Sequence, residues 1–341
     1  MSESLMHAEL REAGPTVARQ LAANRERVSA LALRLRAEPP VAVLTCARGS
    51  SDHAATYAKY LIETRLGVPV ASFTPSVASV YRAPLVTRGM LCLAVSQSGK
   101  SPDLLAAVER MQAGGAAAVA LVNAPGSPLG ALADVELPLH AGPERRVAAT
   151  KSFIAAQVSI ASLVAAWSAD AELEAALETL PAVLEDAADA DWQPFVEAME
   201  QVSGLYVIGR GPGLSVASEA ALKLKETCQI HAEAFSAAEV RHGPMALVGP
   251  GFPLLIFRQD DDGADSVDRL AADAAARGAM VFVAGAEVAG TVRLPVPESG
   301  HPALDTLVQA TAFYAAVETL ARRRGLDPDS PPNLKKVTET V

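Results

Sequence analysis

The sequence predicts an α/β protein made of two doubly wound, parallel-sheet domains that are copies of one unit. Short apolar runs alternate with stretches long enough for helices, a pattern typical of a parallel sheet covered on both faces. Three of these runs recur 162 residues later: 43–46 at 205–208, 91–95 at 253–257, and 119–122 at 281–284. Three matches in one register indicate an internal repeat.

The elements of the first copy can be read in chain order. Apolar residues from about Leu5 to Arg36 recur at helical spacing, and Pro39-Pro40 ends that pattern. Strands are expected at 41–46, near 68–73, at 91–95, at 118–122 and at 135–139, with helices at 52–65 and 103–110. The acidic, alanine-rich stretch 169–191 is expected to be a helical connection. The predicted organisation is a helical segment 1–38, a first domain 39–185 and a second domain 190–341.

Composition indicates a globular protein of the reducing cytoplasm. The 341 residues are 50% hydrophobic and 4% aromatic, enough for a large core of Ala, Val and Leu. Cys46, Cys92 and Cys228 are too dispersed for a disulfide framework or a metal-ligand spacing. The first 14 residues lack the apolar region of a secretion signal. The longest near-apolar segment, 153–167, is short for a membrane span, so no membrane association is expected.

The net charge of the chain limits which classes of ligand are expected. A formal net charge of −10 argues against a nucleic-acid partner, because such proteins usually carry a basic patch or stripe. A phosphorylated metabolite remains compatible with this charge, since local hydroxyls, amides and a helix end can hold a single phosphate.

A small polar loop, 96–101, is the first candidate site. It has the sequence Ser-Gln-Ser-Gly-Lys-Ser and lies between the expected strand 91–95 and helix 103–110. Hydroxyls at a helix N-terminus suit a phosphate, because the amides there are unpaired and the helix dipole is positive. The same residues could simply cap the helix, with Ser98 or Ser101 as the cap. The corresponding second-copy loop, 258–263, is acidic and would repel phosphate.

A charged helix in the second copy is the second candidate. Glu219, Lys223 and Glu226 share one helix face by their spacing, which is more commonly a solvated face with Glu–Lys pairs. The helix follows a strand, however, and ligands of open α/β sheets bind at the carboxyl ends of strands. A carboxylate beside an ammonium in such a cleft could move a proton between adjacent carbons.

Other motifs carry weaker signals. His231 and His242 belong to no metal-like cluster, and a lone histidine is more often structural than catalytic. The sequence Gly99-Lys100-Ser101 ends like a nucleotide-binding P-loop but has Ala94 where that motif needs glycine. The stretch 209–213 lacks the spacing of a dinucleotide fingerprint. Nucleotide chemistry is therefore disfavoured.

Taken together, the two copies resemble tandem sugar-isomerase (SIS) domains, which have a flavodoxin-like or Rossmann-like sandwich fold. The resemblance is to the isomerase part of glucosamine-6-phosphate synthase and to glutaminase-free glucosamine-6-phosphate deaminases. It covers nearly the whole chain from about residue 40. The segments that carry it are 96–99, 219–226, 231–234, 241–244 and 333–336.

The resemblance implies roles for individual residues. The sugar phosphate is expected against Ser50, Ser51, Ser96, Gln97, Ser98 and Ser101, with Val147 and Glu219 also lining the substrate site. Glu226 would be the base that moves the proton between C1 and C2, and Lys223 would stabilise the charge that builds up. His242, often supplied by the partner subunit in this family, would open and close the sugar ring. Lys336 would hold an open-chain ketose as a Schiff base.

The expected function is that of a cytoplasmic homodimeric glucosamine-6-phosphate deaminase of amino-sugar metabolism, with a shared active site and no metal or organic cofactor. It would convert glucosamine 6-phosphate to fructose 6-phosphate and ammonia. Met1-Ser2 leads directly into the isomerase region, so no glutaminase activity is expected. The segment 147–151 has alanine where the synthase has a sugar-contacting serine.

Two other functions remain open from the sequence. One is a deglycase that acts on a fructosamine phosphate by the same open-chain chemistry. The other is a non-enzymatic sugar-phosphate sensor, which could dispense with Glu226 and His242. Both residues are present and no DNA-binding segment is recognised beside the domains, so an enzyme is favoured.

Overall fold

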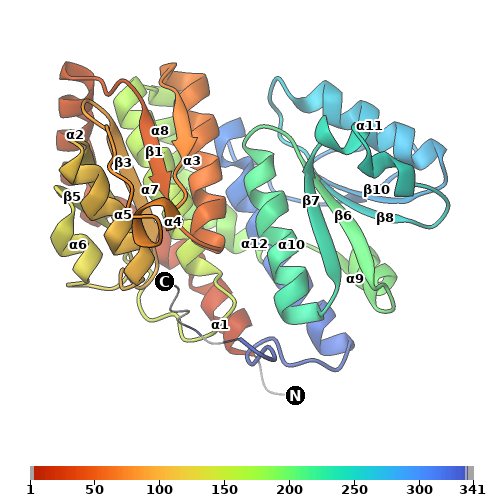
Figure 1. Ribbon diagram of the computed structural model, residues 1–341. Coiled ribbons are helices and arrows are strands. Elements are labelled where there is room, and N and C mark those ends of the chain that lie inside the picture. The colour runs from red at the N-terminus through yellow and green to blue at the C-terminus, as the bar shows by residue number, and fades with distance from the viewer. Residues whose placement is uncertain (1–3, 335, 337–341) are drawn as a thin grey trace. The chain divides into compact units, whose positions relative to one another are not determined.

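The computed structural model describes residues 4–334 and residue 336, and its strands form two parallel five-stranded sheets (Figure 1). The first sheet has the order β2-β1-β3-β4-β5, from β1 (Val43–Cys46), β2 (Val70–Ser72), β3 (Leu91–Ser96), β4 (Ala117–Val122) and β5 (Val135–Pro138). The second has the order β10-β9-β8-β6-β7, from β6 (Gly204–Gly209), β7 (His231–Ser236), β8 (Pro253–Phe257), β9 (Met280–Ala284) and β10 (Val292–Leu294). The predicted α/β fold with two parallel sheets is confirmed.

Helices connect these strands. They are α1 (Leu5–Arg11), α2 (Ala13–Ala37), α3 (Ser50–Leu66), α4 (Ser76–Ser79), α5 (Pro102–Ala113), α6 (Pro128–Leu132), α7 (Lys151–Ser168), α8 (Ala171–Ala187), α9 (Gln193–Met199), α10 (Gly213–Cys228), α11 (Ala264–Ala276) and α12 (Asp305–Arg323), with 3-10 turns η1 (Glu239–Arg241), η2 (Pro244–Leu247) and η3 (Pro302–Leu304). Within the described residues, no helix combines the length and the apolar character that crossing a bilayer requires.

The internal repeat is visible in the strand order. In the first sheet β1 lies between β2 and β3, and in the second β6 lies between β7 and β8, its counterparts. Sequence periodicity missed β7, because its edge position leaves His231 and Glu233 exposed and only Ala232 fully buried. The repeat offset itself could have found it, since it carries β2 onto 232–234, inside β7.

Contacts divide the chain into two compact units. The N-terminal unit contains residues 15–144, 151–178 and 336, and the C-terminal unit contains 4–14, 145–150 and 179–334. The helix α8 contributes residues to both units, which agrees with its expected place in the connection between the copies. The domain boundaries at 38/39 and between 185 and 190 stay predictions.

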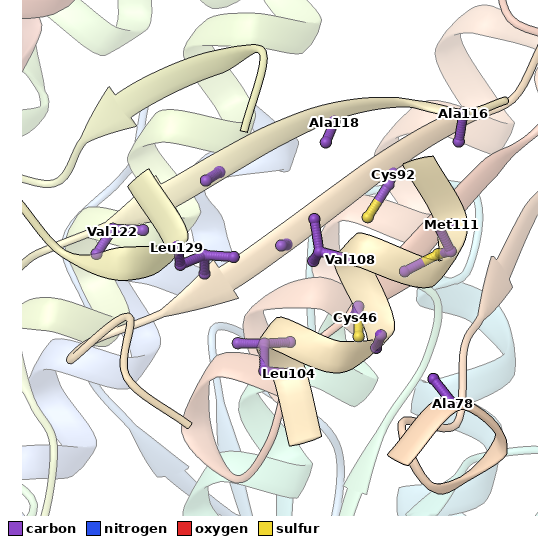
Figure 2. Packing of buried hydrophobic residues seen from close by; sticks show 13 residues of the cluster. Cys46, Ala78, Cys92, Leu104, Val108, Met111, Ala116, Ala118, Val122 and Leu129 are labelled. Carbon is purple, nitrogen blue, oxygen red and sulfur yellow. The ribbon is translucent and has the colours of Figure 1, made fainter. Parts of the chain in front are cut away.

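The core of the N-terminal unit is built from small side chains. Figure 2 shows it between the sheet and the helices α4, α5 and α6, where Cys46, Cys92, Ala118 and Val122 of the strands meet Leu104 and Val108 of α5. Alanines contribute nearly half of this cluster, so α5 can approach the sheet closely and hold the start of the helix in a fixed position. That position matters because α5 follows the loop 96–101.

The three cysteines are expected to be unreactive in the folded protein. Burial raises the pKa of Cys92 and of Cys228 to about 12, and it also raises the pKa of Cys46. The thiolate is the reactive form, so Ellman's reagent at pH 8 should modify none of them quickly in the native protein. All three should react after denaturation in guanidinium. Rapid modification of any of the three in the native protein would contradict their burial, which Figure 2 shows for Cys46 and Cys92.

Candidate functional site

The loop 96–101 is held in a defined shape by hydrogen bonds of the Ser96 side chain and of the neighbouring Leu129 backbone. The hydroxyl of Ser96 accepts a hydrogen bond from the Gly99 amide at 2.9 Å, and the Gly99 carbonyl accepts one from the Leu129 amide at 3.1 Å. Gly99 has a φ of +61°, and a Cβ at this position would collide with the Ser127 side chain. Glycine is therefore required at this point of the turn.

The serines of this loop do not cap the following helix. Ser101 is the N-cap residue of α5, but its side chain makes no capping hydrogen bond, and Pro102 occupies the first helical position. Ser98 accepts from the Lys100 amide at 3.3 Å, which precedes the helix. The capping interpretation therefore fails for Ser98 and Ser101, and in the first turn the Asp103 carboxylate accepts from the Leu104 amide at 2.8 Å instead. The helix does not use the two serine hydroxyls, and this favours the anion-site interpretation.

A second loop lies beside the first at the same edge of the sheet. The strands β1 and β3 are neighbours, with Cys46 opposite Ala94, so Ser50 and Ser51 at the start of α3 follow β1 where the loop 96–101 follows β3. The chain turns in opposite directions along the sheet from these two strands, and ligands of open α/β sheets bind at such a point. The structure thus brings together all six polar residues predicted to hold the phosphate.

An ion pair ties the two loops to each other. Arg48 donates to the Asp103 Oδ2 from Nε at 3.0 Å and from a terminal nitrogen at 2.9 Å, and the Asp103 side chain is only 1% exposed. Sequence reasoning missed this pair. The sequence feature that could have indicated it is Asp103, an aspartate in the first turn of the helix that follows the loop.

The charged cluster on α10 is buried. Glu219 and Lys223 are each 1% exposed and the Glu226 side chain is 16% exposed. The Lys223 ammonium contacts the Glu226 carboxylate and lies 3.4 Å from Glu219 Oε1, which also accepts a hydrogen bond from the Tyr314 hydroxyl of α12 at 3.0 Å. A solvated face of Glu–Lys pairs is therefore excluded. Sequence reasoning missed Tyr314, which carries no local motif.

This cluster keeps Lys223 charged. Burial alone would lower the pKa of Lys223, but the carboxylates of Glu219 and Glu226 outweigh burial, and the pKa is raised. A protonated lysine between two carboxylates neutralises part of their charge. Among the three, Glu226 is the member that reaches the surface.

The charged residues of α10 were expected at the carboxyl end of the preceding strand, and for Glu226 that expectation was wrong. The helix α10 begins near the carboxyl end of β6, but Glu226 lies in its last turn, about 20 Å further along. The next strand, β7, begins at His231 opposite Gly204, the first residue of β6. Glu226 therefore lies towards the amino end of the second sheet, and burial, not strand ends, distinguishes it.

The two histidines occupy opposite ends of β7. His231 begins the strand at the amino end of the sheet, away from the ends where ligands usually bind. His242 is exposed and follows η1, which comes after the carboxyl end of β7. Within the C-terminal unit, His242 and Glu226 are thus separated along β7 by about 20 Å and do not meet.

The tail lysine has a buried partner. The Lys336 ammonium lies 3.4 Å from the Oε2 of Glu144, a carboxylate with no exposed surface. Ser152 donates to the same carboxylate from its amide at 3.1 Å and from its hydroxyl at 2.5 Å. Sequence reasoning missed Glu144 and Ser152. Lys335, part of the quoted tail motif, lies outside the described residues.

The remaining predicted residue, Val147, is half-buried and belongs to the C-terminal unit through the segment 145–150. The serine loops belong to the N-terminal unit, and Glu219, Lys223, Glu226 and His242 to the C-terminal unit. Across 4–334 and 336, no group of three or more His, Cys, Asp or Glu residues is arranged to hold a metal ion.

Two parallel five-stranded sheets with equivalent strand order define a class of tandem α/β domains. The SIS domain family model matches residues 41–166 and 199–290, and the chain belongs to the SIS domain family.

The sequence is also similar to known members. It is 38% identical over 322 residues to the glutamine–fructose-6-phosphate aminotransferase (isomerizing) of Aeropyrum pernix and 33% identical over 313 residues to that of Thermotoga maritima. These alignments cover 88% and 87% of this chain and 51% of each relative, so the chain spans about half the length of the curated relatives.

Solved structures of similar proteins have the same fold. A proposed phosphosugar isomerase from Silicibacter pomeroyi is 45% identical, with a TM-score of 0.92 and coverage of 96% of this chain and 100% of that chain. The C-terminal domain of the glucosamine–fructose-6-phosphate aminotransferase of Francisella tularensis is 25% identical, with a TM-score of 0.86 and coverage of 97% and 99%. The predicted resemblance is thereby confirmed at the level of the family.

Proposed function

We propose that this protein is a phosphosugar isomerase that converts glucosamine 6-phosphate and water to fructose 6-phosphate and ammonia. The observation that carries the proposal is the buried cluster of Glu219, Lys223 and Glu226, whose only appreciably exposed member is a carboxylate beside a protonated lysine. A globular protein rarely buries such charges without a function for them. Similarity to the aminotransferases over their matching half supports the same reaction class.

The phosphate would bind at the serine loops of the N-terminal unit. Ser96, Ser98 and Ser101 supply hydroxyls next to the uncapped start of α5, and Ser50 and Ser51 lie at the same edge of the sheet. Gln97, half-buried between the serines, would donate from its amide. The dipole at the start of α5 favours a negative ligand.

The proton transfer would belong to Glu226. After ring opening, its carboxylate would take the proton from C2 of the amino sugar and return it to C1, which converts the aldose amine to a ketose imine. Water then adds to the imine carbon and the C2–N bond breaks, giving fructose 6-phosphate and ammonia. Because Lys223 is 1% exposed, we assign it to holding Glu226 ionised and oriented, with Glu219 and Tyr314 fixing Lys223 in turn.

The ring-opening acid would be His242 of a second copy of the chain. His242 and Glu226 do not meet within the C-terminal unit. His242 lies in an exposed turn, so in a dimer it could reach the sugar that is bound by the other subunit. We therefore propose a homodimer in the cytoplasm. Mixing a His242→Ala protein with a Glu226→Gln protein should restore part of the activity if subunits exchange, because one of the mixed sites is intact.

Two residues would touch the open-chain sugar from other segments. Lys336 would carry the Schiff base, with the buried Glu144 orienting its ammonium. Val147 would contact the sugar through its backbone or its half-buried side chain.

The experiment that tests this function is ammonia release by the purified protein. Glucosamine 6-phosphate should yield ammonia and fructose 6-phosphate in equal amounts, whereas its N-acetylated analogue should not react. Faster turnover of a fructosamine 6-phosphate would instead identify a deglycase. Binding of glucosamine 6-phosphate without turnover of any of these compounds would identify a sensor. An arm with glutamine in place of the amino sugar tests the expected lack of glutaminase activity.

The serine loop gives a prediction about binding. The double variant Ser96→Ala and Ser98→Ala removes two hydroxyls, one of which also accepts a hydrogen bond from the Gly99 amide in the turn, and it should weaken glucosamine 6-phosphate binding by roughly tenfold to a hundredfold. Isothermal titration of the variant checks this, with Ser79→Ala on α4 as a control. Loss of thermal stability with unchanged affinity would assign these serines a structural role only.

A further inference from the structure

A pocket in the C-terminal unit gathers three arginines at the carboxyl end of its sheet. Its volume is about 460 Å³. Arg210 follows β6, Arg241 lies in η1 after β7, and Arg269 projects from α11, which follows β8 (Figure 1 labels β6, β7 and α11). This is the point in the second sheet that corresponds to the serine loops of the first, and ligands of open α/β sheets bind there.

The charge in this pocket is not balanced. Arg241 pairs with Asp273 at 2.7 Å, and Arg210 donates to the Ser236 hydroxyl at 3.3 Å. Among the described residues, Arg269 makes no hydrogen bond or ion pair and Arg210 pairs with no carboxylate. One carboxylate thus faces three guanidinium groups in a protein with a net charge of −10.

In the first copy, the matching arginine has a carboxylate partner. The repeat offset carries Arg48 onto Arg210 and Asp103 onto Asp265. Arg48 is neutralised by the buried Asp103, whereas Asp265 is exposed and not paired with Arg210. In the neighbouring acidic loop, Asp261 accepts from the Gly263 amide at 2.8 Å and forms no ion pair with Arg210. The second copy has kept the arginine without its partner.

The balance of charge differs in two other pockets. The pocket beyond the end of β8 is lined by two arginines and three acidic residues, and its Arg258 pairs with Asp260 and Asp268 at 2.9 and 3.4 Å. The pocket along α2 is lined by two arginines and two glutamates, and its Arg25 pairs with Glu178 at 3.0 Å. Of these three pockets, the one in the C-terminal unit is the one in which arginines outnumber the acidic residues.

We propose that this pocket binds a phosphate group of a small metabolite, at a site separate from the serine loops. Guanidinium groups bind phosphate through paired charge-assisted hydrogen bonds, and three of them line this pocket. The volume suits a metabolite-sized ligand. The acidic loop 258–263 does not contradict this, because the arginines reach the pocket from β6, η1 and α11.

The test measures the affinity for inorganic phosphate by equilibrium dialysis with radiolabelled phosphate. In the Ser96→Ala/Ser98→Ala protein, which weakens the serine loop, phosphate should still bind, and adding Arg269→Ala should weaken that binding about tenfold. Arg277→Ala is the matched control, because Arg277 is an exposed arginine at the end of α11 outside the pocket, and it should leave the affinity within about twofold.

Two outcomes would overturn the proposal: no phosphate binding by the serine-loop variant, or equal effects of Arg269→Ala and Arg277→Ala. Both substitutions lie on the surface, and equal thermal stability of the two proteins would show that folding does not explain a difference. Because no turnover is measured, failure here leaves the proposed isomerase function unaffected, and failure of the ammonia assay leaves this site unaffected.

Discussion

Replacing Glu226 with Gln should lower kcat for ammonia release by about a thousandfold while leaving the KM for glucosamine 6-phosphate within a few fold. The amide keeps the size of the side chain and can still accept a hydrogen bond from Lys223, so packing and substrate binding are preserved. What is lost is the group that accepts the C2 proton. A steady-state assay of the variant gives both constants.

The control for this variant is Glu287→Gln, an exposed carboxylate in the loop after β9 that should have no effect. A second readout is solvent deuterium incorporation at C1 of the product in D₂O, because the base exchanges its proton with solvent between removal and return. If Glu226→Gln turns over at nearly the wild-type rate, Glu226 is not the base, and the buried cluster on α10 is structural.

Replacing Lys223 with Met should destabilise the C-terminal unit by about 3–5 kcal/mol. The change removes the cation that both carboxylates face and leaves the charge of Glu219, at 1% exposure, without the ammonium that offsets it. A buried carboxylate without a cation costs more free energy than the pair contributes. Urea denaturation followed by circular dichroism measures the effect.

The matched control is Lys225→Met, two residues along the same helix, where the side chain is exposed. It should change stability by less than about 1 kcal/mol. Adding Glu219→Gln to Lys223→Met should recover part of the loss, because the neutral amide needs no counter-charge. Equal stabilities of the Lys223→Met and Lys225→Met proteins would mean that Lys223 and Glu219 are solvated in solution.

Much of the fold could be predicted because its signals are local or repeated. The strands β1, β3, β4, β6, β8 and β9 are continuous apolar runs, and the repeat offset reinforces them in pairs. The strand β7 was missed since an edge strand exposes one face and lacks such a run. The turn at 96–101 could be located because a strand, a glycine and a helix start are consecutive in sequence, and its role as an anion site stays a prediction.

The site could be predicted only in part, because its contacts join residues far apart in the chain. Helical spacing placed Glu219, Lys223 and Glu226 on one face, but whether that face is buried depends on α12 and its Tyr314. The partners Arg48 and Asp103, or Glu144 and Lys336, follow no periodic pattern. Spacing also could not show that Glu226 lies at the far end of α10 from the strand that precedes it.

The ion pair between Arg48 and Asp103 has an electrostatic consequence for the incoming substrate. Asp103 lies in the first turn of α5, where a bare carboxylate would create a negative potential in front of the serines. The guanidinium offsets that potential, and since the Arg48 side chain is 51% exposed, the positive end of the pair is the one that faces the solvent. A dianionic sugar phosphate approaching a protein of net charge −10 therefore meets a local region that does not repel it.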